Sequence, residues 1–458
     1  MIRCSRLPLL FCSVWMAVAL GFAQAKAQEA ARPADPAAAT YQYEAKPNDV
    51  AFEKLNPRLA PPPPAKLLLD KGDLLAIAGD SITEQRMYSR LIETYLIACM
   101  PEMEIEVRQY GWSGEKTDGF LRRMDNDCLR FQPDVVTLSY GMNDARYRPY
   151  DVTNGRWYAD HYRQIVRKCQ AAGAEVVVGS PGCSGKIATW VKSRSGTLDE
   201  HNQHLCALRD IAIDVADQQH VAFADVFWPM YQAKVFAPGR YPGQGWRPYE
   251  MCGRDGIHPD WAGHAIMAYA YLRALGIDGD LGRIHVDMSA DTATAEGGHE
   301  VVSMKQGEVS LISHRYPFCA DGPVDRDDSV RSGMTFVPFD DDLNRLMLTV
   351  SGLSGIATVT WGNQSHTYSP AQLTAGVNLA AEFTDNPFVD AFEDVSQAVA
   401  EKQAFETHQI KKVFHGQSGQ KDMEKAVRET EQQRAPLAQA VRQAVRPVRH
   451  VIRIHTKG

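Results

Sequence analysis

Between residues 74 and 275, short apolar runs alternate with longer stretches of helical spacing. The apolar runs predict strands over 74–78, 104–110, 134–140, 174–179 and 221–227. The helical spacing predicts helices over 84–99, 117–131, 157–172, 199–219 and 261–275. Because such alternation builds a parallel sheet covered by helices on both faces, the pattern predicts an α/β fold with a doubly wound, five-stranded parallel sheet.

Beyond residue 275 the periodicity changes. Strand candidates separated by Gly, Asp and Ser turns cover 283–288, 300–303, 308–313, 334–338, 346–350 and 357–361. Two charged stretches of helical spacing then cover 391–414 and 423–445. Basic residues outnumber acidic ones from Lys411 onward, and we interpret this end as a solvated amphipathic helix with a frayed terminus. The pattern predicts a β-rich accessory module over 277–385 and a C-terminal helical segment over 386–458.

The N-terminus has the features of an export signal. Two arginines precede an apolar run over 7–22, and alanines follow at positions 23, 25 and 27, as in small-x-small cleavage sites. The run is shorter than the roughly 20 residues that a spanning helix needs. We therefore expect a cleaved signal peptide over 1–27, a secreted or periplasmic protein, and no stable membrane insertion. Residues 28–70 are rich in Ala and Pro, which predicts a linker or a surface strap.

Composition and charge limit the class of protein. The chain has 458 residues, of which 44% are hydrophobic and 23% charged, as expected for a globular protein with a large core. Its net charge of −7 does not fit a nucleic-acid-binding protein, which would carry a concentrated basic face. An odd number of cysteines follows the signal peptide, so at least one is free. Cys183 and Cys252, which we expect on the same rim of the sheet, are the predicted disulfide pair.

Four short blocks of mostly polar residues lie at the ends of predicted strands or just before a predicted helix. They read Gly-Asp-Ser at 79–81, Gly-Trp-Ser-Gly at 111–114, Gly-Met-Asn-Asp at 141–144 and Asp-Gly-Ile-His at 255–258. The first three follow strands directly, and the last precedes a helix. Because ligands of doubly wound sheets lie beyond the carboxyl ends of the strands, we expect the four blocks to converge there.

These blocks supply the groups that acyl transfer requires. Ser81, at a strand-to-helix turn, offers a hydroxyl nucleophile and a backbone N–H at a helix N-terminus. Gly114 offers an N–H that a substrate can approach closely, and Asn143 offers a side-chain amide. Three neutral donors of this kind can hold a tetrahedral oxyanion. His258 is the candidate base for Ser81, and Asp255, three residues earlier, can orient its imidazole.

The four blocks, in this order, resemble those of the SGNH hydrolases, also called GDSL-type esterases and lipases. The family name lists Ser, Gly, Asn and His, which fall here on Ser81, Gly114, Asn143 and His258. The resemblance implies a flavodoxin-like α/β/α sandwich over 71–276, here followed by the C-terminal β-rich and helical accessory region. It also implies a serine ester hydrolase that needs no cofactor.

Other polar residues near these blocks allow alternative interpretations. Asp260 and His264 lie close to the last block and raise the alternative of a metal site, but no further ligands with a recognised spacing accompany them, so we predict no metal. Asp144 is interpreted as a structural acceptor. His201 and His204, on a predicted helix, are interpreted as surface or core histidines.

Substrate specificity depends on weaker signals. Trp112, Tyr147 and Trp246 are the predicted substrate contacts, Trp190 lies near the same predicted rim, and a loop over 228–254 is expected to form one wall. The sequence shows no long apolar lid of the kind expected for a lipid-interface enzyme. With export, this predicts an esterase that removes O-acetyl groups from carbohydrate, acting on a small-molecule or polysaccharide acyl ester. The alternatives are a lysophospholipase or thioesterase, and a non-catalytic glycan-binding protein on the same fold.

The accessory module has two possible roles. It either braces the α/β domain, which we favour, or binds glycan. The sequence gives no indication of the oligomeric state.

Overall fold

The computed structural model describes residues 41–192, 195–242 and 247–456. The chain divides into two compact units, Met1–Tyr43 and Glu44–Gly458, and the second contains all the elements discussed below. The predicted signal peptide over 1–27 lies outside the described residues, as does the first part of the predicted linker. Among the helices of the described residues, none is long and apolar enough to cross a membrane.

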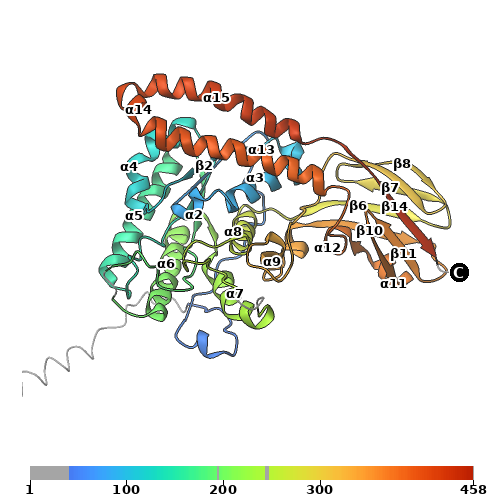
Figure 1. The fold of residues 1–458 in the computed structure, drawn as a ribbon, viewed down its shortest axis with the longest axis horizontal. Coiled ribbons are helices and arrows are strands. Elements are labelled where there is room, and N and C mark those ends of the chain that lie inside the picture. Colours follow the sequence, from blue (N-terminus) through green and yellow to red (C-terminus); the bar gives the residue numbers. More distant parts are fainter. Residues whose placement is uncertain (1–40, 193–194, 243–246, 457–458) are drawn as a thin grey trace, which may run out of the picture. The chain divides into compact units, whose positions relative to one another are not determined.

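A five-stranded parallel sheet forms the centre of the α/β domain (Figure 1). Its order is β2-β1-β3-β4-β5, the doubly wound order, so the predicted fold class is confirmed. Its strands are β1 (Leu74–Gly79), β2 (Glu106–Gly111), β3 (Val135–Ser139), β4 (Glu175–Gly179) and β5 (Ala222–Ala224). All but β5 match their predicted positions within two residues at either end. The strand predicted over 221–227 is too long, because the chain turns after Ala224 into a helix that begins at Phe227.

Helices and short helical turns connect these strands. They are η1 (Val50–Phe52), α2 (Ser81–Glu84), α3 (Tyr88–Cys99), η2 (Pro101–Met103), α4 (Thr117–Asp127), η3 (Leu129–Phe131), α5 (Val152–Ala171), α6 (Leu198–Gln219), α7 (Phe227–Arg240) and α8 (Trp261–Ala274). Side-chain caps begin several of them: Asp151 accepts from the N–H of Asn154, and Thr197 forms a capping box with Glu200.

Helix α7 corrects the loop that the sequence predicted over 228–254. The abundance of Pro, Gly and aromatic residues suggested an irregular wall, but residues up to Arg240 are helical. Pro229 lies in the first turn of α7, where a residue without an N–H breaks no intrahelical hydrogen bond. Only the part after α7 is without regular structure among the described residues of this stretch.

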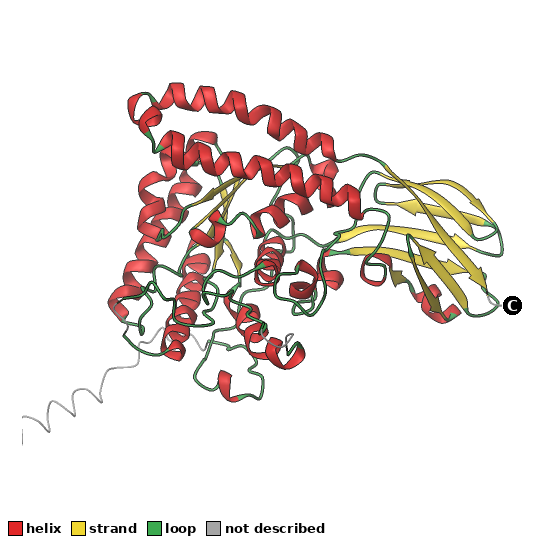
Figure 2. Cartoon of the chain, viewed as in Figure 1, coloured by secondary structure: helices red, strands yellow, loops and turns green. Residues whose placement is uncertain are grey.

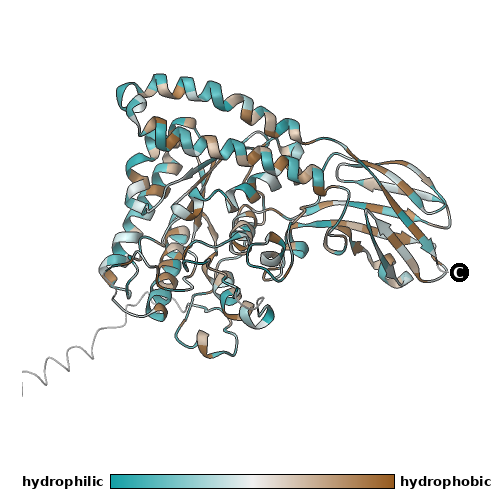
Figure 3. Ribbon diagram, viewed as in Figure 1, coloured by the Kyte–Doolittle hydropathy of each residue, from teal (hydrophilic) through white to brown (hydrophobic). Residues whose placement is uncertain are grey.

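The core follows the sheet. Strands β3 and β4 are buried on both faces, as predicted for a sheet between two helical layers. Figure 3 shows hydrophobic residues on the central strands and a mostly hydrophilic outer surface on α15 (Met423–Ala444). Residues 51–58 contact α6 and α7: Lys54 pairs with Asp199 on α6, and Phe52 meets Trp228 and Tyr231 on α7 with ring centroids 5.5 and 5.6 Å apart.

The accessory region contains two further sheets (Figure 2). The first has the order β13-β10-β6-β7 and the second the order β12-β11-β14-β9-β8. Their strands are β6 (Asp280–Asp287), β7 (Thr292–Glu296), β8 (His299–Lys305), β9 (Glu308–Ser313), β10 (Arg345–Ser351), β11 (Ala357–Trp361), β12 (Gln364–Tyr368), β13 (Val377–Asn378) and β14 (Val448–Thr456). Short helices lie between them: α9 (Val330–Met334), α10 (Phe339–Leu343), α11 (Pro370–Ala375) and α12 (Leu379–Glu382).

One predicted strand of this region is wrong. Residues 334–338 lie at the end of α9 and in the turn after it, because Ser329 caps α9 by accepting from the N–H of Ser332 and starts a helix there. The other strand predictions overlap β6, β8, β9, β10 and β11.

The C-terminal helices are α13 (Val389–His408), a π-helical turn η4 (Gln409–Phe414), α14 (Gln417–Lys421) and α15 (Met423–Ala444). The frayed helical end predicted for the terminus is wrong, since residues 448–456 form β14 between β11 and β9. His450, Ile452 and Ile454 are buried while Arg449 and Arg453 are exposed, which is the alternation of a strand.

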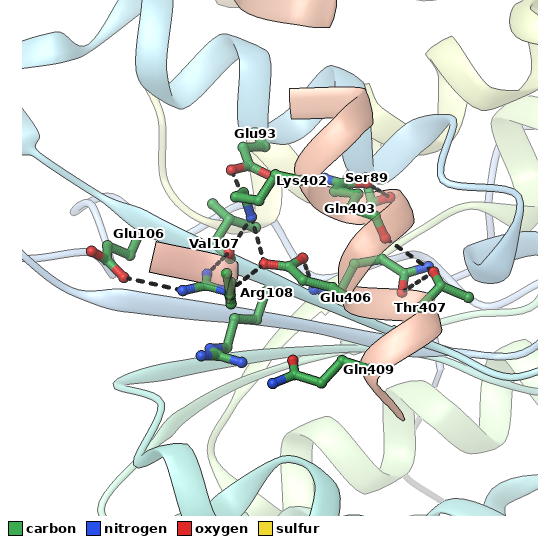
Figure 4. Close-up of polar contacts among 12 residues, drawn as sticks. Ser89, Glu93, Glu106, Val107, Arg108, Lys402, Gln403, Glu406, Thr407 and Gln409 are labelled. Carbon is green, nitrogen blue, oxygen red and sulfur yellow. Dashed lines mark hydrogen bonds and ion pairs between the residues drawn. The ribbon is translucent and has the colours of Figure 1, made fainter. Parts of the chain in front are cut away.

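Helices α13 and α15 cover the free edge of β2 with charged side chains (Figure 4). Lys402 Nζ donates to the carbonyl of Val107 at 2.7 Å, and Arg434 donates to the same carbonyl at 3.1 Å. Glu406 accepts from the N–H of Gln109 at 3.2 Å. Edge strands expose unpaired backbone groups that invite association with other chains, so these contacts close the edge.

Candidate active site

The turn between β1 and α2 presents Ser81 at the carboxyl end of β1. Ser81 is the first residue of α2, and the Asp80 side chain caps this helix by accepting from the N–H of Ile82 at 3.0 Å. A helix N-terminus leaves backbone N–H groups without intrahelical partners, so the Ser81 N–H is free to bind an anion.

The structure brings Ser81, His258 and Asp255 into one hydrogen-bonded chain. Ser81 Oγ lies 2.7 Å from His258 Nε2, and His258 Nδ1 lies 2.7 Å from Asp255 Oδ2. The other Asp255 oxygen accepts from the backbone N–H groups of Ile257 and His258, each at 2.8 Å. This carboxylate therefore fixes both the histidine ring and the backbone that carries it.

Asp255 is held in its charged form. Burial raises the pKa of this carboxyl, but the N–H of His258, its ring and the N–H of Ile257 outweigh burial and hold the pKa below its usual range. An ionised Asp255 keeps the proton of the imidazole on Nδ1 and leaves Nε2 to accept from Ser81.

Asn143 lies beside the serine turn. Its Nδ2 donates to Asp80 Oδ2 at 3.2 Å and to the carbonyl of Glu115 at 3.1 Å, while Tyr147 donates its hydroxyl to Asn143 Oδ1 at 3.3 Å. The amide is thus aimed by three groups. Because both hydrogen bonds that Asn143 Nδ2 donates are longer than 3 Å, an oxyanion can replace one of their acceptors.

Gly114 has a backbone conformation that gives a further reason for glycine at this position. Its φ is +74°, a left-handed conformation that favours glycine. A Cβ built at this position would meet nothing within 4 Å, so the protein itself does not crowd this position.

Buried carboxyl groups lie beneath these residues. Burial raises the pKa of Asp80 to about 7, and the nearby Asp144 and Glu115 also raise it. Burial likewise raises the pKa of Asp144 to about 6, although Asp144 accepts from the N–H and hydroxyl of Thr117 at 3.0 and 2.7 Å. These bonds fit the interpretation of Asp144 as a structural acceptor.

Glu115 and Arg123 support the site and were missed in the sequence. Arg123 donates to both oxygens of Glu115 at 2.8 and 2.7 Å and to the carbonyl of Tyr110 at 2.7 Å. Tyr140 donates its hydroxyl to Glu115 at 2.8 Å. Glu115 lies just before α4 and Arg123 lies within it, and in the sequence both resemble ordinary surface charges, so only the fold reveals that they are buried.

The aromatic residues predicted as substrate contacts lie in different surroundings. Tyr147 contacts Asn143, whereas Trp246 lies outside the described residues. Trp112 packs against the Arg123 guanidinium, 5.2 Å from the ring centroid. Trp190 is 46% exposed, and its ring centroid is 5.7 Å from that of His258. Trp190 is therefore an exposed aromatic side chain placed against the histidine.

A cavity of about 330 Å³ opens beside His258. It is lined by Gln85, Met87, Gly253, Arg254, Asp255, His258, Pro259, Asp260 and Asp327. Most of these side chains are polar or charged. Asp327 comes from the accessory region and accepts from the N–H of Glu250 at 3.0 Å, so that region contributes to the cavity wall.

Cys183 and Cys252 are neighbours, as expected from their loops. Their sulfurs are 3.4 Å apart and both are buried free thiols in this structure. The two histidines on α6, His201 and His204, are also buried. Among the described residues, no group of three or more His, Cys, Asp and Glu side chains is arranged to hold a metal ion.

Comparison with known proteins agrees with this geometry. Residues 77–266 match the GDSL-like lipase/acylhydrolase family. An acetylxylan esterase from Geobacillus stearothermophilus is 24% identical over 236 residues, which cover 46% of this chain and 97% of the esterase. The solved structure of a gut microbial diltiazem-metabolizing enzyme aligns with 87% of this chain and 99% of its own, with 21% identity and a TM-score of 0.66. This last likeness shows a shared fold that extends into the accessory region.

Proposed function

The α/β domain belongs to the GDSL-like lipase/acylhydrolase family and is a carboxylic ester hydrolase, and we propose that it removes O-acetyl groups from carbohydrate by a serine mechanism. The observation that carries this proposal is the chain of hydrogen bonds from Ser81 through His258 to Asp255, with 2.7 Å at each step.

In the proposed first step, Ser81 Oγ attacks the ester carbonyl and passes its proton to His258 Nε2. Asp255 stabilises the imidazolium that forms. The N–H groups of Ser81 and Gly114 and the amide of Asn143 hold the negative oxygen of the tetrahedral intermediate, which collapses when His258 returns the proton to the departing sugar hydroxyl.

In the second step, water attacks the acetyl group on Ser81. His258 accepts a proton from this water and gives it back to Ser81 Oγ as acetate leaves. The same donors hold the second oxyanion, so the reaction requires no group beyond those of the chain.

Two features support a carbohydrate substrate. The exposed ring of Trp190 lies against His258, where a sugar ring can stack on it. The cavity beside His258 offers Asp260 and Asp327 as acceptors for hydroxyl groups. The related esterase from Geobacillus stearothermophilus is described as acting on acetylxylan, which is an acetylated carbohydrate.

A series of 4-nitrophenyl esters from acetate to decanoate tests the substrate class. We expect kcat/KM to be highest for acetate and to fall at least about tenfold by octanoate, because the polar cavity gives a long chain little apolar surface to bury. A preference for the long chains would contradict the acetylesterase and favour a lipid acyl hydrolase. Release of acetate from acetylated xylo-oligosaccharides, measured in parallel, tests the carbohydrate part.

A further inference from the structure

One lysine of the C-terminal helices contacts a residue close to the candidate nucleophile. Lys411 lies in the π-helical turn η4, which follows α13 directly. Its Nζ is 2.6 Å from Glu84 Oε1, and both side chains are largely shielded from solvent. π-helical turns are rare and often occur at functional sites.

Glu84 connects the two loops that supply oxyanion donors. It is the last residue of α2, the helix that begins at Ser81. Its Oε2 accepts from the backbone N–H of Ser113 and from the Ser113 hydroxyl, the latter at 2.6 Å. Ser113 directly precedes Gly114, so the carboxylate holds the residue from which the peptide with the Gly114 N–H continues.

Close packing leaves this loop little freedom. A Cβ built at Gly111 would lie 2.2 Å from the backbone nitrogen of Glu84, so only glycine allows the loop to pack on α2 at this point. The N–H of Trp112 donates to the carbonyl of Gly79 at 3.0 Å. The Lys411 ammonium lies 5.3 Å from the centroid of the Trp112 ring, on which it makes a cation–π contact.

Buried charges hold α13, the helix that η4 and Lys411 follow directly (Figure 4). Lys402, whose side chain is 2% exposed, pairs with Glu93 at 3.0 Å and with Glu406 at 2.7 Å. On the other side of Lys411, His415 contacts the Asp127 carboxyl at 2.8 Å. Moving α13 would leave buried charges without partners, which is costly, so η4 has a fixed position relative to the sheet.

Lys411 also maintains the charge of Glu84. Burial raises the pKa of Glu84, but the hydrogen bonds from Lys411 and Ser113 outweigh burial and hold the pKa below its usual range. An ionised Glu84 can accept hydrogen bonds from the N–H and from the hydroxyl of Ser113 at the same time.

We propose that Lys411 is a positioning residue for ester hydrolysis: through Glu84 it holds Ser113, and Ser113 in turn sets the orientation in which the next residue, Gly114, presents its N–H to the oxyanion. The inference rests on the proposed function of Ser81 and Gly114. The C-terminal helical segment then contributes to the reaction rate in addition to covering β2. Since Lys411 contacts neither the serine nor the histidine, its loss affects kcat and leaves KM nearly unchanged.

The test compares Lys411→Met with Lys411→Arg and with a matched control. Arg442 on α15 pairs with Glu106 on β2 at 2.7 Å, so Arg442→Met removes a cation that joins the same helical segment to the α/β domain away from the loop. On 4-nitrophenyl acetate we expect Lys411→Met to lower kcat about tenfold with KM within about twofold. We expect Lys411→Arg to recover kcat to within about threefold, and Arg442→Met to match the wild type.

Glu84→Gln provides a second, independent variant. If Lys411 acts through Glu84, Glu84→Gln lowers kcat at least as much as Lys411→Met, and the double variant is no slower than Glu84→Gln alone. Should Lys411→Met fail to fold, Glu84→Gln against Arg442→Met carries the same test. A kcat for Lys411→Met equal to that of Arg442→Met, a change confined to KM, or effects that multiply in the double variant would overturn the proposal.

Labelling by a fluorophosphonate separates this inference from the function on which it rests. We expect Ser81 of the wild type to react rapidly and that of Lys411→Met about tenfold more slowly. Equal rates for the two proteins would overturn the positioning role alone. A wild type whose Ser81 does not react would overturn the proposed function and this inference together.

Discussion

Asp80 shows how one buried carboxyl links the stability of the site to pH. It is 2% exposed, caps α2 and accepts from Asn143. Its pKa of about 7 in the folded protein lies above the ordinary value of 3.8. The folded state therefore binds this proton more tightly than the unfolded state, and the stability that it supplies is complete below pH ~4 and lost as the pH rises through 7.

Replacing Asp80 tests the direction of this pH dependence of stability. We expect the free energy of unfolding of the wild type to fall between pH 5 and pH 8 by on the order of 2–4 kcal/mol more than that of Asp80→Asn, because the variant has no proton to lose there. Urea unfolding at the two pH values measures the difference. Asp160→Asn, which changes an exposed carboxyl, is the control and should keep the wild-type slope. Parallel pH slopes for Asp80→Asn and the wild type would contradict this assignment.

At the residue scale, the sequence predicts the motif residues of the site, but it does not predict the buried charged residues that hold them in position. Ser81, Asn143 and His258 stand in short blocks at strand ends, where topology alone predicts convergence. Glu115, Arg123 and Lys411 lie in stretches that read as solvated charge. Their burial depends on elements that are distant in the sequence, so no local pattern reveals it.

At the scale of elements, two neighbouring loops meet beside the histidine. The N–H of Gly185 donates to the carbonyl of Gly256 at 2.8 Å, and the sulfurs of Cys183 and Cys252 are 3.4 Å apart. A bond between these thiols would join the loop after β4 to the loop that carries Asp255.

We expect this bond to form when the protein is produced in an oxidising compartment, with a disulfide-containing oxidant accepting the two electrons and protons. It would close a loop with a sequence separation of 69 residues and raise the unfolding free energy by about 2–4 kcal/mol. Peptide mapping without reductant should find Cys183 linked to Cys252, and reduction should lower the melting temperature of the wild type but not of a Cys183→Ser/Cys252→Ser variant. Alkylation of both thiols in the denatured, unreduced protein would show that the bond is absent.

Elements with clear periodicity were predictable, and those defined by long-range pairing were not. The central strands matched their apolar patterns, although β5 was predicted too long. The helices lie where they were predicted, but the one expected over 84–99 is divided into α2 and α3, and α5 begins at Val152 and not at 157. Strand β14 was missed because its arginines dominate the terminal sequence, while its partners β9 and β11 lie far away in the chain. Helix α7 was missed because its prolines read as a loop signal.

At the scale of the whole molecule, the segments after residue 276 are interwoven. The chain leaves the accessory sheets at β13, passes through the helices that cover β2, and returns to the second sheet as β14. Asp327 and Lys411 connect these segments to the candidate site. A division into consecutive modules therefore follows the order of the sequence but not the packing of the chain.

The central claim is that Ser81 is the nucleophile of an ester hydrolase. The most direct test measures kcat/KM of Ser81→Ala on 4-nitrophenyl acetate, together with its unfolding midpoint. We predict a loss of about a thousandfold or more at an unchanged midpoint, because the oxyanion donors alone cannot replace the attacking oxygen. An activity within about tenfold of the wild type in the folded variant would contradict the account.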